Sequence, residues 1–228
     1  MIYLEIYFVI LALLLVICVK VDMAIKKYKS VDNKKNLSGM EIARNLLDDN
    51  KLESVYVIEK RSKFIDRYVY NRKTVILSSD VFHENSLYAL AVGAYVGMHG
   101  VYDKKNNSLF RFIETFGVVR YASYFASLVL LLLGMFNDNV SAYQIALILL
   151  IFSLIFSVLA FVVNRNAAYD TYDYLKKNKC FEKSEDDDIS TILKNVYLES
   201  FTWYFVVLVN GIINTINESK KNWNEWIS

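Results

Sequence analysis

The sequence predicts an α+β membrane protein that is mainly α-helical, with three to four transmembrane helices and a small cytosolic domain. The chain of 228 residues is 55% hydrophobic, and its apolar residues gather in long blocks. Blocks of about 20 apolar residues are long enough to cross a bilayer. The chain contains no proline and only two cysteines, which excludes proline-rich, collagen-like and disulfide-scaffold classes.

The first apolar block, residues 2–21, is interrupted only by Glu5 and Lys20. As a helix it is long enough to cross a hydrocarbon core about 30 Å thick. A signal peptide would carry its basic residues before a shorter apolar run and would end at a small-residue cleavage site. Here the lysines follow the run and no such site is present. Residues 1–22 are therefore predicted to be a retained N-terminal transmembrane helix.

Two more apolar blocks, 118–136 and 143–163, are joined by a short polar loop. They predict a transmembrane hairpin over residues 118–163, because so short a connection makes two helices antiparallel neighbours. The polar stretch that follows, 164–190, is predicted to be a cytosolic helical segment.

A fourth apolar stretch, 191–217, is predicted to be a C-terminal transmembrane helix, followed by a tail at 218–228. Its hydropathy signal is weaker because Glu199, Asn210 and Asn214 interrupt it. Polar groups inside a span usually face protein. A partly buried or interfacial helix therefore stays open as the alternative.

Lysine and arginine placement predicts the orientation of the chain. Basic residues cluster after the first block and after the third, whereas the hairpin loop has none. By the positive-inside rule, the N-terminus lies outside and residues 23–117 form a cytosolic domain in a multi-pass protein of the cell membrane. A net charge of +2 gives no argument for nucleic acid. The expected partners are the lipid bilayer and either another membrane protein or a second copy of the chain.

The predicted cytosolic domain begins with a capped helix. Ser38 followed by Glu41 forms a capping box, and the helix runs to about Asn50. Alternation over 54–59 and an extended stretch over 64–78 predict a short strand pair. Residues 84–102 predict a helix that is apolar on most sides and is therefore buried.

These elements carry motifs in a specific order and spacing. The motifs are Ser38-Gly39-x-Glu41-x-Ala43-Arg44, Asp66-x-Tyr68, Val75-x-Leu77-Ser78 and Ser86-Leu87-x-Ala89-Leu90. Together with one apolar block before them and a hairpin after them, they resemble the YugP-like membrane zinc metallopeptidases. The resemblance extends over roughly residues 5–215.

The resemblance implies an H-E-x-x-H zinc motif on the 84–102 helix. Two His at i and i+4 share one helical face and can bind one Zn²⁺, and the Glu between them acts as general base. Here Ala94 and Met98 occupy the two His positions and Tyr95 the Glu position. The family's later acidic ligand corresponds to Asn164. The helix is thus a degenerate active-site helix, and neither zinc nor any other cofactor is expected in this chain.

Asp66, Tyr68, Tyr95 and Asn164 could form a leftover binding cleft, although such residues are more often structural hydrogen-bonding groups. The only histidines, His83 and His99, are predicted to point away from each other. The sequence favours a catalytically inactive homologue of a membrane-embedded zinc metallopeptidase that acts as a membrane scaffold, regulator or complex subunit. The alternatives are a functional zinc metallopeptidase with non-standard ligands and a purely structural membrane subunit.

Overall fold

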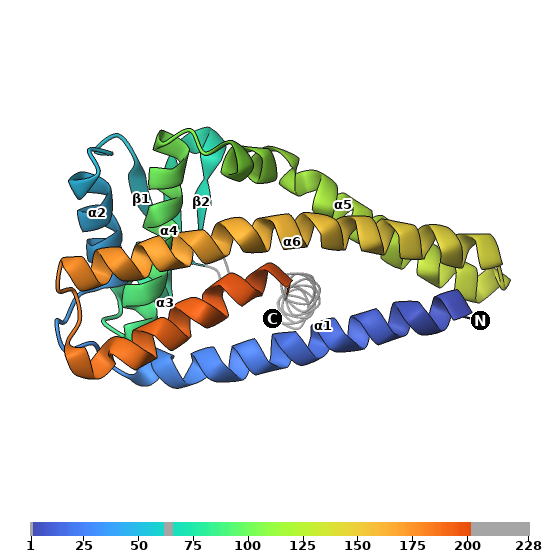
Figure 1. Cartoon of the computed structure of the whole chain (residues 1–228), viewed down its shortest axis with the longest axis horizontal. Coiled ribbons are helices and arrows are strands. Elements are labelled where there is room, and N and C mark those ends of the chain that lie inside the picture. Colours follow the sequence, from blue (N-terminus) through green and yellow to red (C-terminus); the bar gives the residue numbers. More distant parts are fainter. Residues whose placement is uncertain (1, 62–65, 202–228) are drawn as a thin grey trace, which may run out of the picture.

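The computed structural model describes residues 2–61 and 66–201. Its elements, in chain order, are α1 (Ile2–Lys26), α2 (Gly39–Asp49), β1 (Tyr56–Lys60), β2 (Arg67–Val69), β3 (Thr74–Ser78), α3 (Ser79–His83), α4 (Leu87–Lys104), α5 (Ser108–Asn137) and α6 (Val140–Lys177). A further helix begins at Asp186 and continues through residue 201. The long helices α1, α5 and α6 extend away from a small α/β unit at one end of the molecule (Figure 1).

The three long helices α1, α5 and α6 are each long and apolar enough to cross a membrane. Large apolar side chains cover their outer faces, including Val9, Val118 and Ile148 at 59%, 74% and 63% exposure. Three of the four predicted spans are therefore present as helices among the described residues. Of the fourth, 191–217, only the part up to 201 is described, and it is helical. The rest of it and the predicted tail lie outside the described residues.

The boundaries of the hairpin helices differ from the sequence prediction. The helix α5 begins at Ser108, ten residues before the predicted start of the hairpin, because the Asn107 side chain accepts a hydrogen bond from the Phe110 N–H at 2.9 Å and caps it there. The helix α6 continues through the predicted border at 163/164 to Lys177. No proline or glycine lies between Val140 and Lys177 to end the helix, so the polar half simply extends the apolar half.

Serine hydroxyls connect the three long helices. Ser127 of α5 donates to the Ala146 carbonyl of α6 at 2.8 Å, and Tyr7 of α1 lies 2.7 Å from the same Ser127 oxygen. Because the Ser127 proton is already used, Tyr7 is the donor of the second bond. Such interhelical hydrogen bonds fix register where apolar side chains alone would not.

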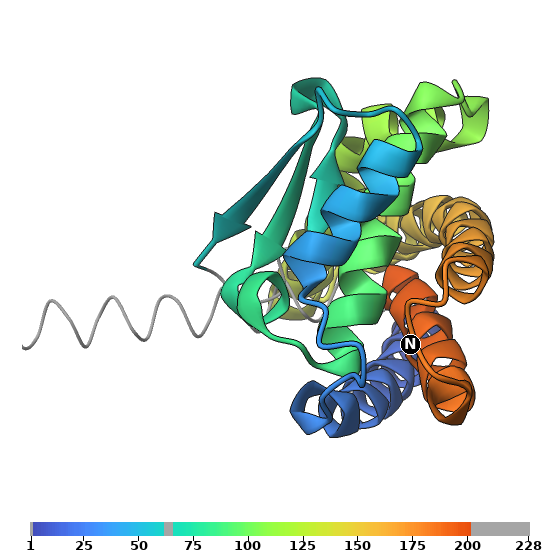
Figure 2. The same cartoon turned by 90° about the vertical axis from the view of Figure 1, so that its left-hand side faces the viewer.

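The small unit contains a three-stranded sheet rather than the predicted strand pair. Its strand order is β1-β3-β2. β1 pairs with β3 in parallel, and β2 pairs with β3 antiparallel. All five residues of β3 are buried, and β3 is the central strand with a neighbour on each side. Helices α2 and α4 lie on one side of this sheet, and α6 lies beyond α4 (Figure 2).

Serine side chains cap the first turns of α2 and α4, and the first of these caps was predicted. The Ser38–Glu41 capping box is present at the start of α2, with Asn50 at its C-terminal end. The helix α4 begins at Leu87 rather than at residue 84, since the Ser86 hydroxyl accepts from the Ala89 N–H at 3.1 Å and sets the first turn. Sixteen of its 18 residues are buried, which confirms the prediction of a helix buried on most sides.

A close backbone contact joins α2 to α4. A Cβ added to Gly93 of α4 would lie 2.2 Å from the carbonyl oxygen of Gly39, the first residue of α2. No real Cβ can occupy that position, so only glycine allows the two helices to approach this closely. This contact fixes where the motif positions of α4 lie against the rest of the domain.

Candidate functional site

The three motif positions of α4 lie inside the main hydrophobic core. The exposed fractions of Ala94, Tyr95 and Met98 are 0%, 6% and 5%. All three belong to the same cluster of buried residues as Val163 and Ala167 of α6. The face of α4 on which the resemblance places zinc chemistry is therefore in a packed core.

The groups at these positions do not fit a zinc ion. Zinc in proteins takes imidazole, thiolate and carboxylate ligands. Ala94 has no donor atom and Met98 offers only a thioether. At the general-base position, burial raises the pKa of the Tyr95 phenol well above its usual value, so the phenol keeps its proton and cannot accept one from water.

Asn164, which the resemblance assigns to the position of the family's acidic ligand, hydrogen-bonds within the protein. Its side-chain nitrogen donates to the Ser200 hydroxyl at 2.7 Å, and that hydroxyl donates to the Tyr197 carbonyl at 2.9 Å. Asn164 thereby ties α6 to the helix that begins at Asp186. A neutral amide that donates is a poor replacement for a carboxylate ligand.

His99 lies next to Asn164, a proximity that sequence spacing did not predict. Its ring contacts Tyr95 with a centroid distance of 4.7 Å and stacks on Phe110 at 5.6 Å. Burial lowers the pKa of His99 to about 4, although a side-chain hydrogen bond to Asn164 acts in the opposite direction. His99 is therefore neutral near pH 7. The crossing of α4 and α6 brings the two residues together, and the helical period alone carries no signal for it.

The other two candidate cleft residues lie elsewhere. Tyr68 of β2 donates to a carboxylate oxygen of Asp103 at 2.6 Å, and Asp103 follows Tyr95 by eight residues, about 12 Å along the helix axis. Asp66 accepts from the backbone N–H of Ser78 at 2.6 Å and from its hydroxyl at 3.1 Å. The structure thus brings Tyr95 and Asn164 near His99, and it engages Tyr68 and Asp66 in separate structural contacts.

His83 lies in a different helix from His99 and is exposed. It ends α3, a helix separate from α4, and its Nε2 lies 3.3 Å from a carboxylate oxygen of Glu59 with a side chain that is 64% exposed. Across residues 2–61 and 66–201, no group of three or more His, Cys, Asp or Glu side chains is placed to hold a metal ion.

The described part of the chain combines three helices that are long and apolar enough to cross a membrane with a small α/β unit at one end. The family described as "Putative neutral zinc metallopeptidase" matches residues 3–210. The chain belongs to this family.

A curated relative gives the same assignment. The chain is 27% identical over 175 residues to the "Putative membrane protease YugP" of Bacillus subtilis (strain 168), across 76% of this chain and 77% of that protein. No solved structure matches the chain. Family membership thus rests on sequence similarity over most of the chain, and the residues at its motif positions are those described above.

Proposed function

We propose that this protein is a catalytically inactive member of its zinc metallopeptidase family and acts in the membrane as a scaffold, regulator or complex subunit. The observation that carries the proposal is the packing of α4. Ala94 and Met98 are buried against other apolar side chains, where an active member would need two imidazoles, a metal ion and a water molecule. Neither residue supplies a zinc ligand of the usual kinds.

Zinc analysis of the purified full-length chain in detergent tests this proposal. The protein is expected to hold far less than one zinc per chain after dialysis against trace zinc, with no change in the variants His83→Ala and His99→Ala. Stoichiometric zinc that is lost in either variant would overturn the proposal and favour a functional metallopeptidase with non-standard ligands. An Ala94→Ser variant serves as the matched control, because it alters the motif face without removing an imidazole.

The proposal includes insertion as a multi-pass protein with the N-terminus outside and the α/β unit in the cytosol. Three long helices with exposed apolar faces support insertion, and the lysines after α1 support the orientation. In a background lacking Cys18 and Cys180, an impermeant maleimide is expected to label Asp138→Cys in intact cells and Lys51→Cys only after permeabilisation. The reverse pattern would overturn the orientation.

A scaffold or subunit must contact another protein through its exposed faces. Photo-crosslinkers at Val118 and Ile148, which are 74% and 63% exposed, are expected to capture a second membrane protein or a second copy of the chain. Crosslinks to lipid alone from both positions would contradict a scaffold role.

A further inference from the structure

A cavity of about 290 Å³ lies at the C-terminal end of α4. Tyr68, Lys73, Asp103 and Arg111 line it, together with the loop that follows α2. Lys73 and Arg111 come from the turn before β3 and the first turn of α5. Four segments that are separate in the sequence therefore converge on this cavity, away from the motif face of α4.

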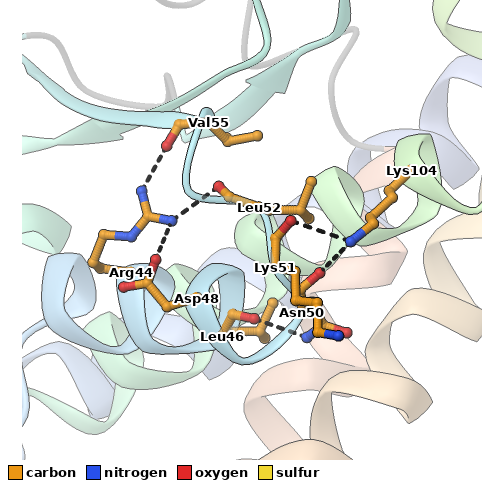
Figure 3. Close-up of polar contacts among 8 residues, drawn as sticks. All are labelled: Arg44, Leu46, Asp48, Asn50, Lys51, Leu52, Val55 and Lys104. Carbon is orange, nitrogen blue, oxygen red and sulfur yellow. Dashed lines mark hydrogen bonds and ion pairs between the residues drawn. The ribbon is translucent and has the colours of Figure 1, made fainter.

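Side chains brace the loop that forms one wall of this cavity (Figure 3). The Arg44 guanidinium donates to the Val55 carbonyl at 2.6 Å and to the Leu52 carbonyl at 3.0 Å. On the other side, the Lys104 ammonium donates to the carbonyls of Asn50 and Lys51 at 2.6 and 3.1 Å. The wall is thus held in place before any ligand binds.

The cavity is lined by the buried carboxylate of Asp103, and only one of its two oxygens accepts hydrogen bonds from described residues. Asp103 is 4% exposed. Its Oδ2 accepts hydrogen bonds from the Tyr68 hydroxyl and the Lys73 ammonium. Its Oδ1 forms an ion pair with Arg111 at 3.7 Å but has no hydrogen-bond partner among the described residues. A buried oxygen that accepts no hydrogen bond lowers the stability of the folded state. A ligand that donated a hydrogen bond to Oδ1 would therefore be stabilised at this site.

The charge around the cavity favours an anion. Three cationic side chains line it, Lys73, Lys104 and Arg111, against the single carboxylate of Asp103, which leaves an excess of two positive charges. The Arg111 Nε also lacks a hydrogen-bond partner among the described residues. A ligand that fits these groups is an anion that also carries a proton for Asp103.

We propose that this cavity binds a singly protonated phosphate group, either free phosphate or a phosphate monoester. In the complex the Arg111 side chain, which is 41% exposed, moves from Asp103 toward the phosphate and uncovers Oδ1. The unprotonated oxygens of the phosphate then accept from Lys73 and Arg111, while its P–O–H donates to Asp103 Oδ1. Monoesters have a second pKa of about 6, so the protonated form is available near neutral pH. Sulfate has the same shape and no proton to donate, so Asp103 excludes it. The site is independent of the proposed loss of catalysis.

Calorimetric titration of the full-length chain in detergent tests the site with three probes: inorganic phosphate, glycerol 3-phosphate and sulfate. Both phosphates are expected to bind at least about tenfold more tightly than sulfate, the ratio that corresponds to one hydrogen bond to a charged group. Tighter binding of glycerol 3-phosphate would indicate an esterified ligand, and tighter binding of inorganic phosphate would indicate the free ion. Equal binding of sulfate and phosphate, or no binding of either phosphate, would overturn the proposal.

Variants assign the effect to the named side chains. Asp103→Asn can still accept from Tyr68 and can also donate to sulfate, so the preference for phosphate is expected to vanish. Arg111→Gln, on the partly exposed first turn of α5, is expected to weaken phosphate binding at least about tenfold. The control Lys105→Gln removes the same charge from an exposed position outside the cavity. It should leave phosphate binding unchanged. A wild-type preference retained by Asp103→Asn would contradict the role of Oδ1.

Discussion

Replacing Gly93 with alanine tests the close contact that positions α4. The new Cβ would lie 2.2 Å from the Gly39 carbonyl oxygen and 2.7 Å from its Cα. Because comfortable carbon contacts are about 3.5 Å or longer, the first turn of α2 must move by about 1 Å. Overpacking of this kind costs about 1–3 kcal/mol or more, and a backbone carbonyl cannot rotate away as a side chain can. The higher helix propensity of alanine than of glycine offsets at most about 1 kcal/mol of this loss in stability.

We therefore expect Gly93→Ala to lower the free energy of unfolding by about 2 kcal/mol, or roughly 4–8 °C in Tm for a chain of this size. Thermal unfolding in detergent, followed by circular dichroism, measures the shift. The control Gly117→Ala has nothing within 4 Å of its new Cβ and should stabilise α5 slightly. Gly97→Ala, whose nearest atom is the Ala43 carbonyl oxygen at 3.4 Å, should fall between them. Equal Tm values for Gly93→Ala and Gly117→Ala would refute the reasoning.

Three further predictions use the same unfolding measurement. Ser38→Ala should lower the free energy of unfolding by about 1 kcal/mol because it removes the N-cap of α2. An unchanged Tm would contradict that role. Tyr68→Phe should lower the free energy of unfolding by about 2 kcal/mol because it removes a donor from the buried Asp103 carboxylate. The control Tyr174→Phe, which loses an exposed hydrogen bond to Asp49, should lower it much less. Similar losses in the two variants would contradict the argument from burial. Because the pKa of His99 is about 4 when folded and about 6.5 when unfolded, the unfolded state binds the proton first as pH falls. Protonation of His99 in the unfolded state should then lower the free energy of unfolding by as much as about 3 kcal/mol between pH 6.5 and 4. In the His99→Leu variant, the free energy of unfolding should vary less with pH over this range than in the wild type.

Local signals in the sequence predicted individual elements well. The Ser38–Glu41 capping box, the polar loop of the hairpin and the apolar character of α4 each depend on residues close together in the chain, and each is present in the structure. The longer helices were harder to delimit, because hydropathy marks where apolar residues end and not where hydrogen bonding ends. The helix α6 therefore continues to Lys177, well past the predicted border.

Contacts between distant segments were beyond the sequence argument. The parallel pairing of β1 with β3 depends on a crossover through β2, and no local pattern specifies it. Asp103 gave no signal as a site residue, since nothing nearby in sequence shows that Tyr68 and Lys73 will donate to it. His99 was expected only to point away from His83, and the crossing of α4 with α6 places it beside Asn164.

The family and the mainly helical character follow from the sequence alone, because motif order and apolar block length are properties of the chain as written. The tertiary structure was needed to show that Ala94 and Met98 lie in a packed core and that Tyr68 and Asp66 make separate contacts. It also decided that four segments meet around Asp103. Packing is settled by helix crossings such as that at Gly39 and Gly93, and these depend on how whole elements fit together.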